Sequence, residues 1–446
     1  TDPYNGEVRI NEFKQMVQAL HQNDIRVVMD VVYNHTGATA DSDFNKIVPG
    51  YYYRQNEDGS FSNGSGCGNE TASERLMMRK FMIDSVKYWA TEYNIDGFRF
   101  DLMALHDTKT MNDLADALHK IDPSIIIYGE GWTGGGSPLP DSEAAFKGNA
   151  KKTEDIAYFN DDMRDAVKGS VGNDREAGYI NGNTSDYFYE RLKFGITGSI
   201  NHDQVDNNQW YAWAANPSQS ISYVSAHDNN TLYDKLLGVQ TASKGDTSDE
   251  YIKMLQKQAN AIVLTGQGVP FLHAGVEMMR SKGGDHNSYN KPDEVNQIDW
   301  SLKSDNLDVV KYYQGLIELR KAHPAFRMMS ATEVQENLSF FDNADNQIIH
   351  FTISNNANGD TVSDIDVVHN VTDNVRWVKL SQYGEWTTVV NGESAGVKAL
   401  DVQTAEWVEV QPHSTYVFML NYTEPGTDEP GTDEPGTDEP GTDEPG

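Results

Sequence analysis

Short apolar segments alternate with amphipathic segments over the first 325 residues or so, and this alternation constrains the fold more than any other feature. The apolar segments are nearly continuous, as expected of parallel strands that are buried on both faces. The segments between them place apolar residues at helical spacing. This strand–helix repeat predicts a parallel sheet. Six strands are expected near residues 26–32, 96–101, 125–130, 156–160, 221–226 and 269–274, and helices at 7–23, 77–93, 111–120, 249–265 and 307–322.

The pattern changes after residue 328, where apolar and polar residues alternate with period two. Residues 349–353, 375–378, 386–389 and 415–419 show this pattern, and turn residues separate them. We therefore expect an all-β antiparallel sandwich domain over residues 329–422. Residues 423–446 repeat Thr-Asp-Glu-Pro-Gly and contain no apolar core residues, so they are expected to form a disordered acidic linker toward a surface or a further module. A disordered tail without a partner is the alternative.

Composition excludes several classes of partner. The net charge of −33 argues against nucleic acid and against an anionic membrane surface. Cys67 is the single cysteine, so no intrachain disulfide can form. No apolar run reaches the roughly 18 residues that a membrane span needs, and we expect no membrane insertion. Thr1 is not an initiator methionine, so we expect a processed or cut N-terminus.

The segment 94–103 carries the clearest chemical signal. Arg99 and Asp101 are two residues apart on the expected strand, so they share one face, while Phe98 and Phe100 share the other. A nearby guanidinium favours the ionised form of a carboxyl group. An ionised, positioned carboxylate is what a nucleophile requires. A buried structural ion pair explains the same pattern equally well.

Three further strands also end in polar or charged residues, and the carboxyl ends of parallel strands in a barrel meet on one face. We expect Asp30, Asn34, His35, Arg99, Asp101, Glu130, His227 and Asp228 to gather there. Two carboxyl groups in one pocket suit glycoside hydrolysis with retention of configuration.

The carboxyl groups are assigned different roles. Asp101 is the expected nucleophile. Glu130 lies beside Trp132 and two glycines, so an apolar setting should raise its pKa and keep a proton available for general acid catalysis. Asp228 and His227 are expected to hold sugar hydroxyls. His35 is expected to donate a hydrogen bond to another hydroxyl, and Trp132 to stack on a sugar ring.

These residues also carry a resemblance to a known family. Four segments resemble, in order, the four sequence regions of the α-amylase superfamily: Asp30-Val31-Val32-Tyr33-Asn34-His35, Gly97-Phe98-Arg99-Phe100-Asp101, Tyr128-Gly129-Glu130-Gly131-Trp132 and Ser225-Ala226-His227-Asp228-Asn229. The Gly-Glu-Gly-Trp form and the segment 283–290 are similar to type I pullulanases. The resemblance covers roughly residues 1–420.

The resemblance implies a (β/α)8 TIM-type barrel over residues 1–328, with residues 36–75 as a long loop. It implies hydrolysis of α-1,6-glucosidic branch bonds in pullulan, starch or glycogen, without a required cofactor. It assigns nucleophile, acid/base and transition-state stabiliser to Asp101, Glu130 and Asp228. Supporting positions are matched by Asp30, Asn34, His35, Arg99 and His227. The implied partner is a branched α-glucan, and the implied location is extracellular, at the cell surface or cell wall.

The chain departs from the family at its N-terminal end. Relatives carry a Tyr-Asn-Trp-Gly-Tyr motif at the end of the second barrel strand, and this chain opens just after that point. The first two barrel strands are therefore expected to be missing, which leaves an open sheet edge. We expect the chain to be a fragment of a larger secreted enzyme that is weakly active or inactive alone.

Three other functions remain open from the sequence. An α-1,4-acting neopullulanase or amylase of the same superfamily is the nearest alternative. A surface glucan-binding protein that kept the fold without catalysis is a second, but such a protein need not retain Asp101, Glu130 and Asp228 together, and the intact set argues against it. A metal-dependent enzyme is less favoured, because the histidines and carboxylates show no recognised ligand spacing and no metal ligands are assigned. A structural Ca²⁺ in the loop 36–75 would be compatible with its composition, but no ligand spacing marks it.

Overall fold

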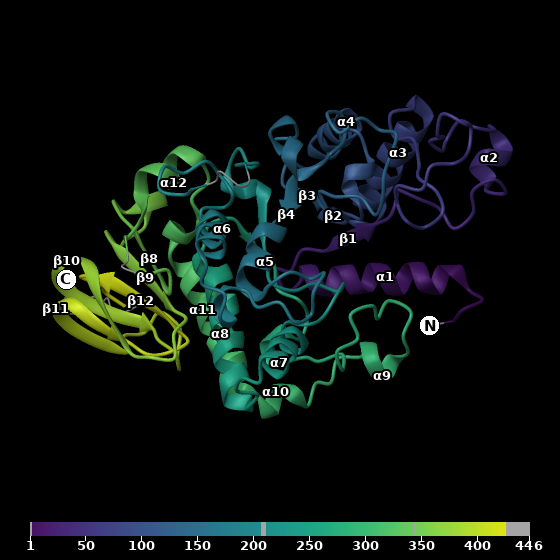
Figure 1. Ribbon diagram of the computed structural model, residues 1–446. Helices are drawn as coiled ribbons and strands as arrows, with labels where there is room; N and C mark the ends of the chain where they lie inside the picture. Colours follow the sequence, from purple (N-terminus) through teal and green to yellow (C-terminus); the bar gives the residue numbers. More distant parts are fainter. Residues whose placement is uncertain (1, 207–210, 343–344, 425–446) are drawn as a thin grey trace, which may run out of the picture.

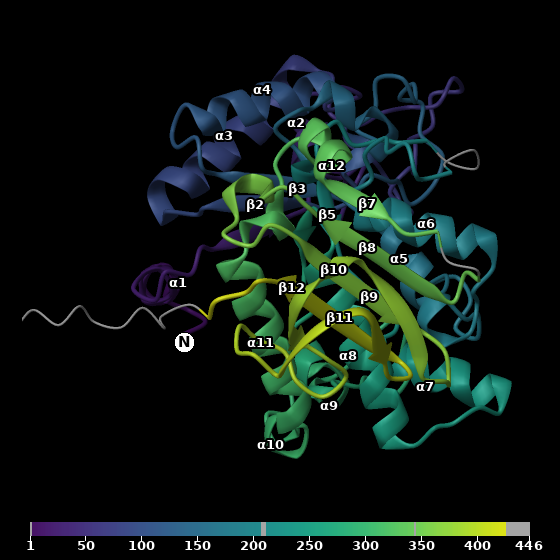
Figure 2. The same cartoon turned by 90° about the vertical axis from the view of Figure 1, so that its left-hand side faces the viewer.

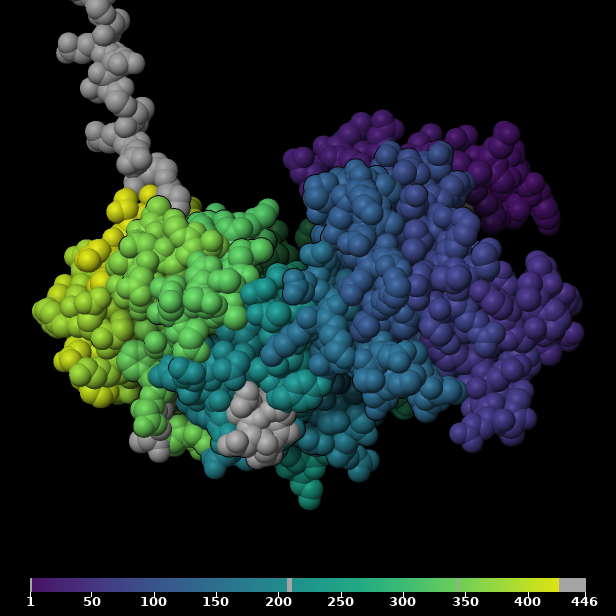
Figure 3. Space-filling view, turned by 90° about the horizontal axis from the view of Figure 1, so that it is seen from above, coloured from purple at the N-terminus to yellow at the C-terminus, as the bar shows by residue number. Residues whose placement is uncertain are grey.

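The computed structural model describes residues 2–206, 211–342 and 345–424, and the predicted linker repeat lies almost entirely outside these ranges. The N-terminal part and the antiparallel part lie at opposite ends of the molecule (Figure 3). The described α-helices are α1 (Gly6–His21), α2 (Asp43–Ile47), α3 (Leu76–Tyr93), α4 (Thr108–His119), α5 (Asp161–Lys168), α6 (Asp186–Ile196), α7 (Leu232–Ser243), α8 (Asp249–Thr265), α9 (Asp293–Asn296), α10 (Leu302–Asp305), α11 (Leu307–Ala322) and α12 (Ala331–Asn337). No helix in these ranges is long and apolar enough to cross a membrane.

All six predicted parallel strands form, and they pair in chain order within one sheet. Figure 1 labels the first four of them. They are β1 (Val28–Val31), β2 (Gly97–Phe100), β3 (Ile126–Gly129), β4 (Ala157–Phe159), β5 (Ser220–Ser222) and β6 (Val269–Pro270). Within the described ranges β1 and β6 are the two edges of the sheet, and neither pairs with the other. The parallel β/α architecture and the open edge therefore agree with the sequence.

The outer face of the sheet packs against the helices. Phe98 and Phe100 of β2 are fully buried in the main apolar core. Helices α3 and α4 supply apolar stripes to this core, as their spacing predicts; they include Met78, Met82, Val86, Met111, Leu114 and Leu118. Asp107 caps α4 by accepting a hydrogen bond from the backbone N–H of Thr110 at 2.8 Å, which starts the helix three residues before its first predicted apolar position.

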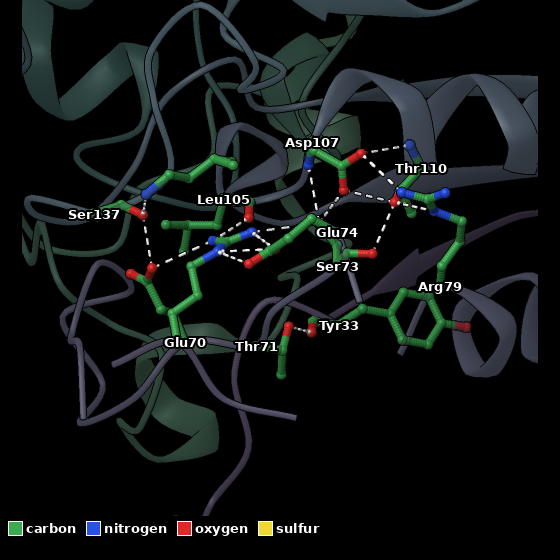
Figure 4. A network of polar contacts seen from close by, with 12 residues as sticks. Tyr33, Glu70, Thr71, Ser73, Glu74, Arg79, Leu105, Asp107, Thr110 and Ser137 are labelled. Carbon is green, nitrogen blue, oxygen red and sulfur yellow. Dashed lines mark hydrogen bonds and ion pairs between the residues drawn. The ribbon is translucent and has the colours of Figure 1, made fainter. Parts of the chain in front are cut away.

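The long loop 36–75 is held to the rest of the chain by polar contacts, and its Glu70 and Ser73 lie beside Ser137 and Asp107 (Figure 4). The Arg54 side chain, only 4% exposed, donates to the carbonyl oxygen of Leu105 at 2.7 Å and to Glu70 at 3.3 Å. Glu70 also accepts from the Ser137 hydroxyl at 2.6 Å. Leu105 follows β2 and Ser137 follows β3, so the loop is fixed directly to the two segments that leave the carboxyl ends of these strands.

Six antiparallel strands form the second part of the chain (Figure 2). They are β7 (Leu338–Phe340), β8 (Ile348–Ile353), β9 (Ile365–Asn370), β10 (Arg376–Val390), β11 (Asp401–Val410) and β12 (Ser414–Leu420), and they pair in the order β11-β10-β12-β9-β8-β7. One face of β8, β9 and β12 joins the main core that also contains α8 and α11.

A second apolar core lies on the other face of these strands. It brings Ile348, Val368 and Phe418 together with Val378, Leu380 and Trp386 of β10 and Val408 and Val410 of β11. The first half of β10 and the end of β11 therefore fold over the inner strands as a second layer. The two layers of the predicted sandwich are continuous through β10, because its second half pairs with β12.

Arg54→Met should destabilise the protein strongly, because it leaves the fully buried Glu70 carboxylate without its cation. Removing one partner of a buried ion pair costs about 3–5 kcal/mol. The matched control is Glu74→Gln, which breaks the second ion pair of the same arginine at a side chain that is 39% exposed. That exchange should cost at most about 1 kcal/mol. Urea unfolding measures both, and equal losses would contradict a loop anchored through Glu70.

Candidate active site

One guanidinium joins three carboxylates at the carboxyl ends of neighbouring strands. Arg99 on β2 lies opposite Asp30 of β1 in the strand register. Its Nη1 contacts Asp30 at 2.9 Å and Asp101 at 3.3 Å, and its Nη2 contacts Glu130 at 2.5 Å. The Arg99 and Glu130 side chains are each 7% exposed, whereas Asp101 is 26% exposed. The shortest contact of Arg99 is therefore with Glu130, a pairing that the sequence does not reveal.

Glu130 is held tightly and buried. The backbone N–H of Leu102 donates to its Oε2 at 2.9 Å, with Leu102 in a left-handed conformation at φ 39°. Such a conformation costs a non-glycine residue about 1–3 kcal/mol. The two residues that flank Glu130 must be glycines, because any side chain there would clash with the backbone. An added Cβ at Gly129 would lie 2.6 Å from the Phe100 carbonyl oxygen, and one at Gly131 would lie 2.7 Å from the backbone nitrogen of Lys147.

Burial raises the pKa of Glu130 above its ordinary value. Arg99 and the Leu102 N–H oppose this shift, while the negative charges of Asp101 and Asp228 add to it. The direction matches the one expected from the sequence, although the sequence argument did not include the arginine. Because the charges of Asp101 and Asp228 both act on Glu130, the three groups assigned catalytic roles from the sequence interact electrostatically.

Asn34 and His35 orient Asp101. The Asn34 amide donates to Asp101 Oδ2 at 2.9 Å and to the Asp101 carbonyl oxygen at 2.6 Å. This leaves the Asn34 carbonyl oxygen to face His35 Nδ1 at 2.6 Å, so that ring nitrogen carries a proton. A neutral His35 then presents Nε2 as an acceptor. It can donate to a ligand only when protonated, which differs from the donor role expected from the sequence.

A hollow of about 300 Å³ lies beside this cluster. Arg99, Glu130, Trp132, His227 and Asp228 line it. Asp30, Asn34, His35 and Asp101 do not line it; Asp30 and Asp101 contact Arg99 Nη1, Asn34 binds Asp101, and His35 contacts Asn34. The predicted site residues thus form one connected group. Arg99 and Glu130 join the residues that line the hollow with them (Trp132, His227 and Asp228) to those that do not line it (Asp30, Asn34, His35 and Asp101).

Asp228 is placed by a loop from elsewhere in the chain. Its side chain is 64% exposed, and its Oδ1 lies 3.6 Å from His227 Nε2. The ammonium group of Lys282 donates to the His227 carbonyl oxygen at 3.0 Å and to the Ser288 hydroxyl at 2.7 Å. Segment 281–291, which includes the pullulanase-like residues, therefore supports the backbone that carries His227 and Asp228.

The sequence reasoning missed part of the lining. Phe159 and Tyr223 contribute aromatic walls, and the Arg99 guanidinium lies 5.7 Å from the Phe159 ring centroid. Both lie in segments predicted as strands, so their inward direction was available from the alternation. Arg164, which donates to the Tyr223 hydroxyl at 2.9 Å, and Lys168, whose pKa burial lowers to about 7, gave no comparable signal.

Within the part of the chain that the structure describes, no group of three or more histidine, cysteine or acidic side chains is arranged to hold a metal ion. The loop 36–75 uses its buried acid, Glu70, to bind Arg54, Ser137 and the Gly64 N–H. A structural Ca²⁺ there stays an untested expectation.

Comparison with known proteins identifies similar sequences. A family profile described as "Pullulanase, all-beta domain" matches residues 334–394. The chain is 40% identical over 381 residues to the pullulanase of Bacillus subtilis strain 168, covering 84% of this chain and 51% of that protein. It is 33% identical over 400 residues to "Pullulanase 1, chloroplastic" of Arabidopsis thaliana, covering 77% of this chain and 40% of that protein. The chain thus spans about half the length of the bacterial relative.

Solved structures agree with this. The pullulanase from Bacillus acidopullulyticus superimposes with a TM-score of 0.86 at 42% identity, covering 93% of this chain and 49% of that chain. The type I pullulanase from Bacillus subtilis, complexed with maltose, has a TM-score of 0.88 at 36% identity and covers 94% and 57% of the two chains. The pullulanase from Paenibacillus barengoltzii, complexed with maltohexaose and α-cyclodextrin, has a TM-score of 0.86 at 42% identity, with coverage of 94% and 62%.

Two substitutions should move the pKa of Glu130 in opposite directions. Arg99→Gln removes a positive charge that lowers this pKa, so the pKa should rise further. Asp228→Asn removes a negative charge that raises it, so the pKa should fall. An NMR titration that follows the Glu130 side-chain carboxyl carbon measures both shifts, with circular dichroism to check folding. Shifts of the same sign in the two folded variants would contradict the arrangement of charges described here.

Proposed function

The chain belongs to the pullulanase family, and on that premise we propose that it is the glycoside hydrolase portion of a debranching enzyme. The proposed reaction is hydrolysis of α-1,6-glucosidic branch bonds in pullulan, starch or glycogen, with retention of configuration at the anomeric carbon. The chain covers about half of its Bacillus subtilis relative, so the activity of the whole protein is part of this proposal.

The observation that carries the proposal is the Arg99 cluster. Asp101 and Glu130 contact the same guanidinium, and burial raises the pKa of Glu130. A retaining glycosidase needs one carboxylate as nucleophile and a second carboxyl group, about 5–5.5 Å away, that carries a proton. The raised pKa of Glu130 favours its protonated form, which suits Glu130 to the acid/base role.

In the first step, the glycosidic bond breaks. Protonated Glu130 gives its proton to the glycosidic oxygen while Asp101 Oδ attacks the anomeric carbon, which forms a covalent glycosyl–carboxylate bond. Asn34 holds Asp101 in place through its amide at 2.9 Å. Asp228, which lines the hollow together with Glu130, stabilises the positive charge that develops on the sugar ring.

In the second step, water completes the hydrolysis. The Glu130 carboxylate takes a proton from water, the water oxygen bonds to the anomeric carbon, and Asp101 leaves as a carboxylate. Glu130 is thereby returned to its protonated state. Trp132 and His227 line the hollow, where Trp132 stacks on a sugar ring and His227 hydrogen-bonds to a sugar hydroxyl. The Nε2 of His35, which lies outside this lining, accepts from another hydroxyl of the glucan.

Partners and location extend the same proposal. The proposed partner is a branched α-glucan, and complexes of relatives with maltose and maltohexaose support it. We place the protein outside the cell, at the surface or cell wall, with residues 423–446 as a linker to further modules. No cofactor is required in this proposal. Cell fractionation tests the location, and loss of hydrolysis on adding EDTA would refute metal independence.

Asp101→Asn should remove nearly all turnover while leaving glucan affinity largely intact. The amide keeps the shape of the side chain and its contact with Asn34, but it cannot form the covalent intermediate. Turnover of pullulan is measured in a protein that includes the natural flanking sequence, and maltotriose affinity is measured by calorimetry. A loss of turnover below about tenfold, roughly 1.4 kcal/mol, would make the assignment of the nucleophile wrong.

The products from pullulan separate this function from its nearest rivals. Cleavage of α-1,6 bonds releases maltotriose, whereas an α-1,4-acting neopullulanase releases panose. We expect maltotriose, detected by chromatography of the digest. Release of panose would show that the protein is an α-1,4-acting enzyme instead. If a protein of the relatives' full length binds glucan but releases no product, a non-catalytic glucan-binding protein would be favoured.

A further inference from the structure

A second cavity lies between the β/α part and the antiparallel part, away from the acidic cluster. Its volume is about 740 Å³, against about 300 Å³ for the hollow beside Glu130, and the two share no lining residue. Its walls come from the 3₁₀ helix η3 (Tyr179–Asn181), the segment that joins α7 to α8, the turn between β9 and β10, and the turn between β11 and β12. A volume of this size is typical of small-molecule sites, which span about 300–1,000 Å³.

Two buried polar atoms of lining residues have no partner. Asn181 is 8% exposed, and its carbonyl oxygen accepts from the Gly178 N–H at 2.6 Å while its Nδ2 makes no hydrogen bond. His413 is 6% exposed, and its Nε2 contacts Asp373 Oδ1 at 2.7 Å while its Nδ1 makes no hydrogen bond. Because the carboxylate only accepts, Nε2 carries the proton and Nδ1 of the neutral ring is an acceptor. Native proteins rarely leave such atoms unpaired.

The lining matches a neutral ligand with both apolar faces and hydroxyl edges. Tyr251, Met254 and Pro412 supply apolar surface, and amide and hydroxyl side chains surround them. No lysine or arginine lines the cavity, whereas the carboxylates of Asp246 and Asp373 do, which disfavours an anion. No metal-binding cluster occurs here or elsewhere in the described ranges. A hexose ring has CH faces that pack on an aromatic ring and hydroxyls that pair with amides and carboxylates.

We propose that this cavity is a second carbohydrate site that holds a non-reacting stretch of α-1,4-linked glucan. The exposed amides of Gln347 and Asn374 and the exposed carboxylate of Asp246 bind sugar hydroxyls at the cavity wall, and Tyr251 contacts a ring face. The choice of glucan rests on the proposed function. The cavity would retain the polymer on the enzyme while a branch point is presented to the Asp101–Glu130 cluster.

The test fills the cavity from its rim. Ser243 is exposed, lines the cavity, and donates its hydroxyl to the Gln240 carbonyl oxygen at 3.1 Å. Thr241 is exposed on the same helix, does not line the cavity, and donates to the Leu237 carbonyl oxygen at 2.7 Å. Ser243→Trp should therefore occupy the cavity, and Thr241→Trp is its matched control.

The probe is maltotriose, and the readout is hydrogen exchange of backbone amides in residues 240–254 and 371–374. Maltotriose should slow exchange there in the unmodified chain and in Thr241→Trp, and its apparent affinity should fall at least tenfold in Ser243→Trp. If Ser243→Trp fails to fold, Gln347→Leu takes its place as the test. This change is at an exposed residue on another wall of the cavity and should weaken maltotriose binding several-fold. Absence of slowed exchange, or equal affinity in the folded Ser243→Trp variant, would overturn the site.

This outcome is separate from that of the proposed function, because exchange in residues 240–254 does not depend on turnover. A protein that releases no maltotriose from pullulan but shows the cavity-dependent protection would refute the reaction and keep the site. Slowed exchange only around residues 226–230, with none in residues 240–254, would keep the reaction and refute the site. Slowed exchange with calcium chloride in place of maltotriose would also overturn the carbohydrate assignment.

Discussion

The Arg99 guanidinium is the contact on which the candidate site depends. Three carboxylates at the ends of three successive strands would repel one another without a shared cation. Burial alone would lower the pKa of Arg99, but Glu130, Asp30 and Asp101 together raise it, so the cation is retained in a mostly buried position. The charge distribution that a substrate meets is therefore built before the substrate arrives. Pre-organised charge of this kind is a large contribution to enzyme catalysis.

Buried cations also hold the loops that surround the site. Arg54 binds the carbonyl oxygen of Leu105, after β2, and Lys282 binds the carbonyl oxygen of His227, after β5. Each donor comes from a segment distant in sequence and fixes the backbone of a segment that bears catalytic candidates. This mode of anchoring lets long irregular loops present side chains in a defined geometry.

The sequence predicted features that depend on local order. The six parallel strands were found because each is a short, nearly continuous apolar run, and α3, α8 and α11 were found because their apolar stripes are uninterrupted. It did not reveal the Arg99–Glu130 contact, because these side chains meet only when β2 and β3 pair. Strand β9 was also missed. It is buried throughout, and polar residues such as Asp366 and His369 interrupt its pattern while their partners lie on other strands.

Strand β10 was predicted as two separate segments, 375–378 and 386–389, because polar residues and Gly384 divide its apolar pattern. In the structure it is a single strand of 15 residues with an irregularity between Lys379 and Gly384. Both halves of β10 pair with β11, and only the second half also pairs with β12, which packs on α8. Pulling the outer layer away would therefore strain the inner layer and α8 through one unbroken backbone. The antiparallel part is thus joined to the β/α part through β12 and α8, and its outer layer cannot separate without bending a strand that both layers share.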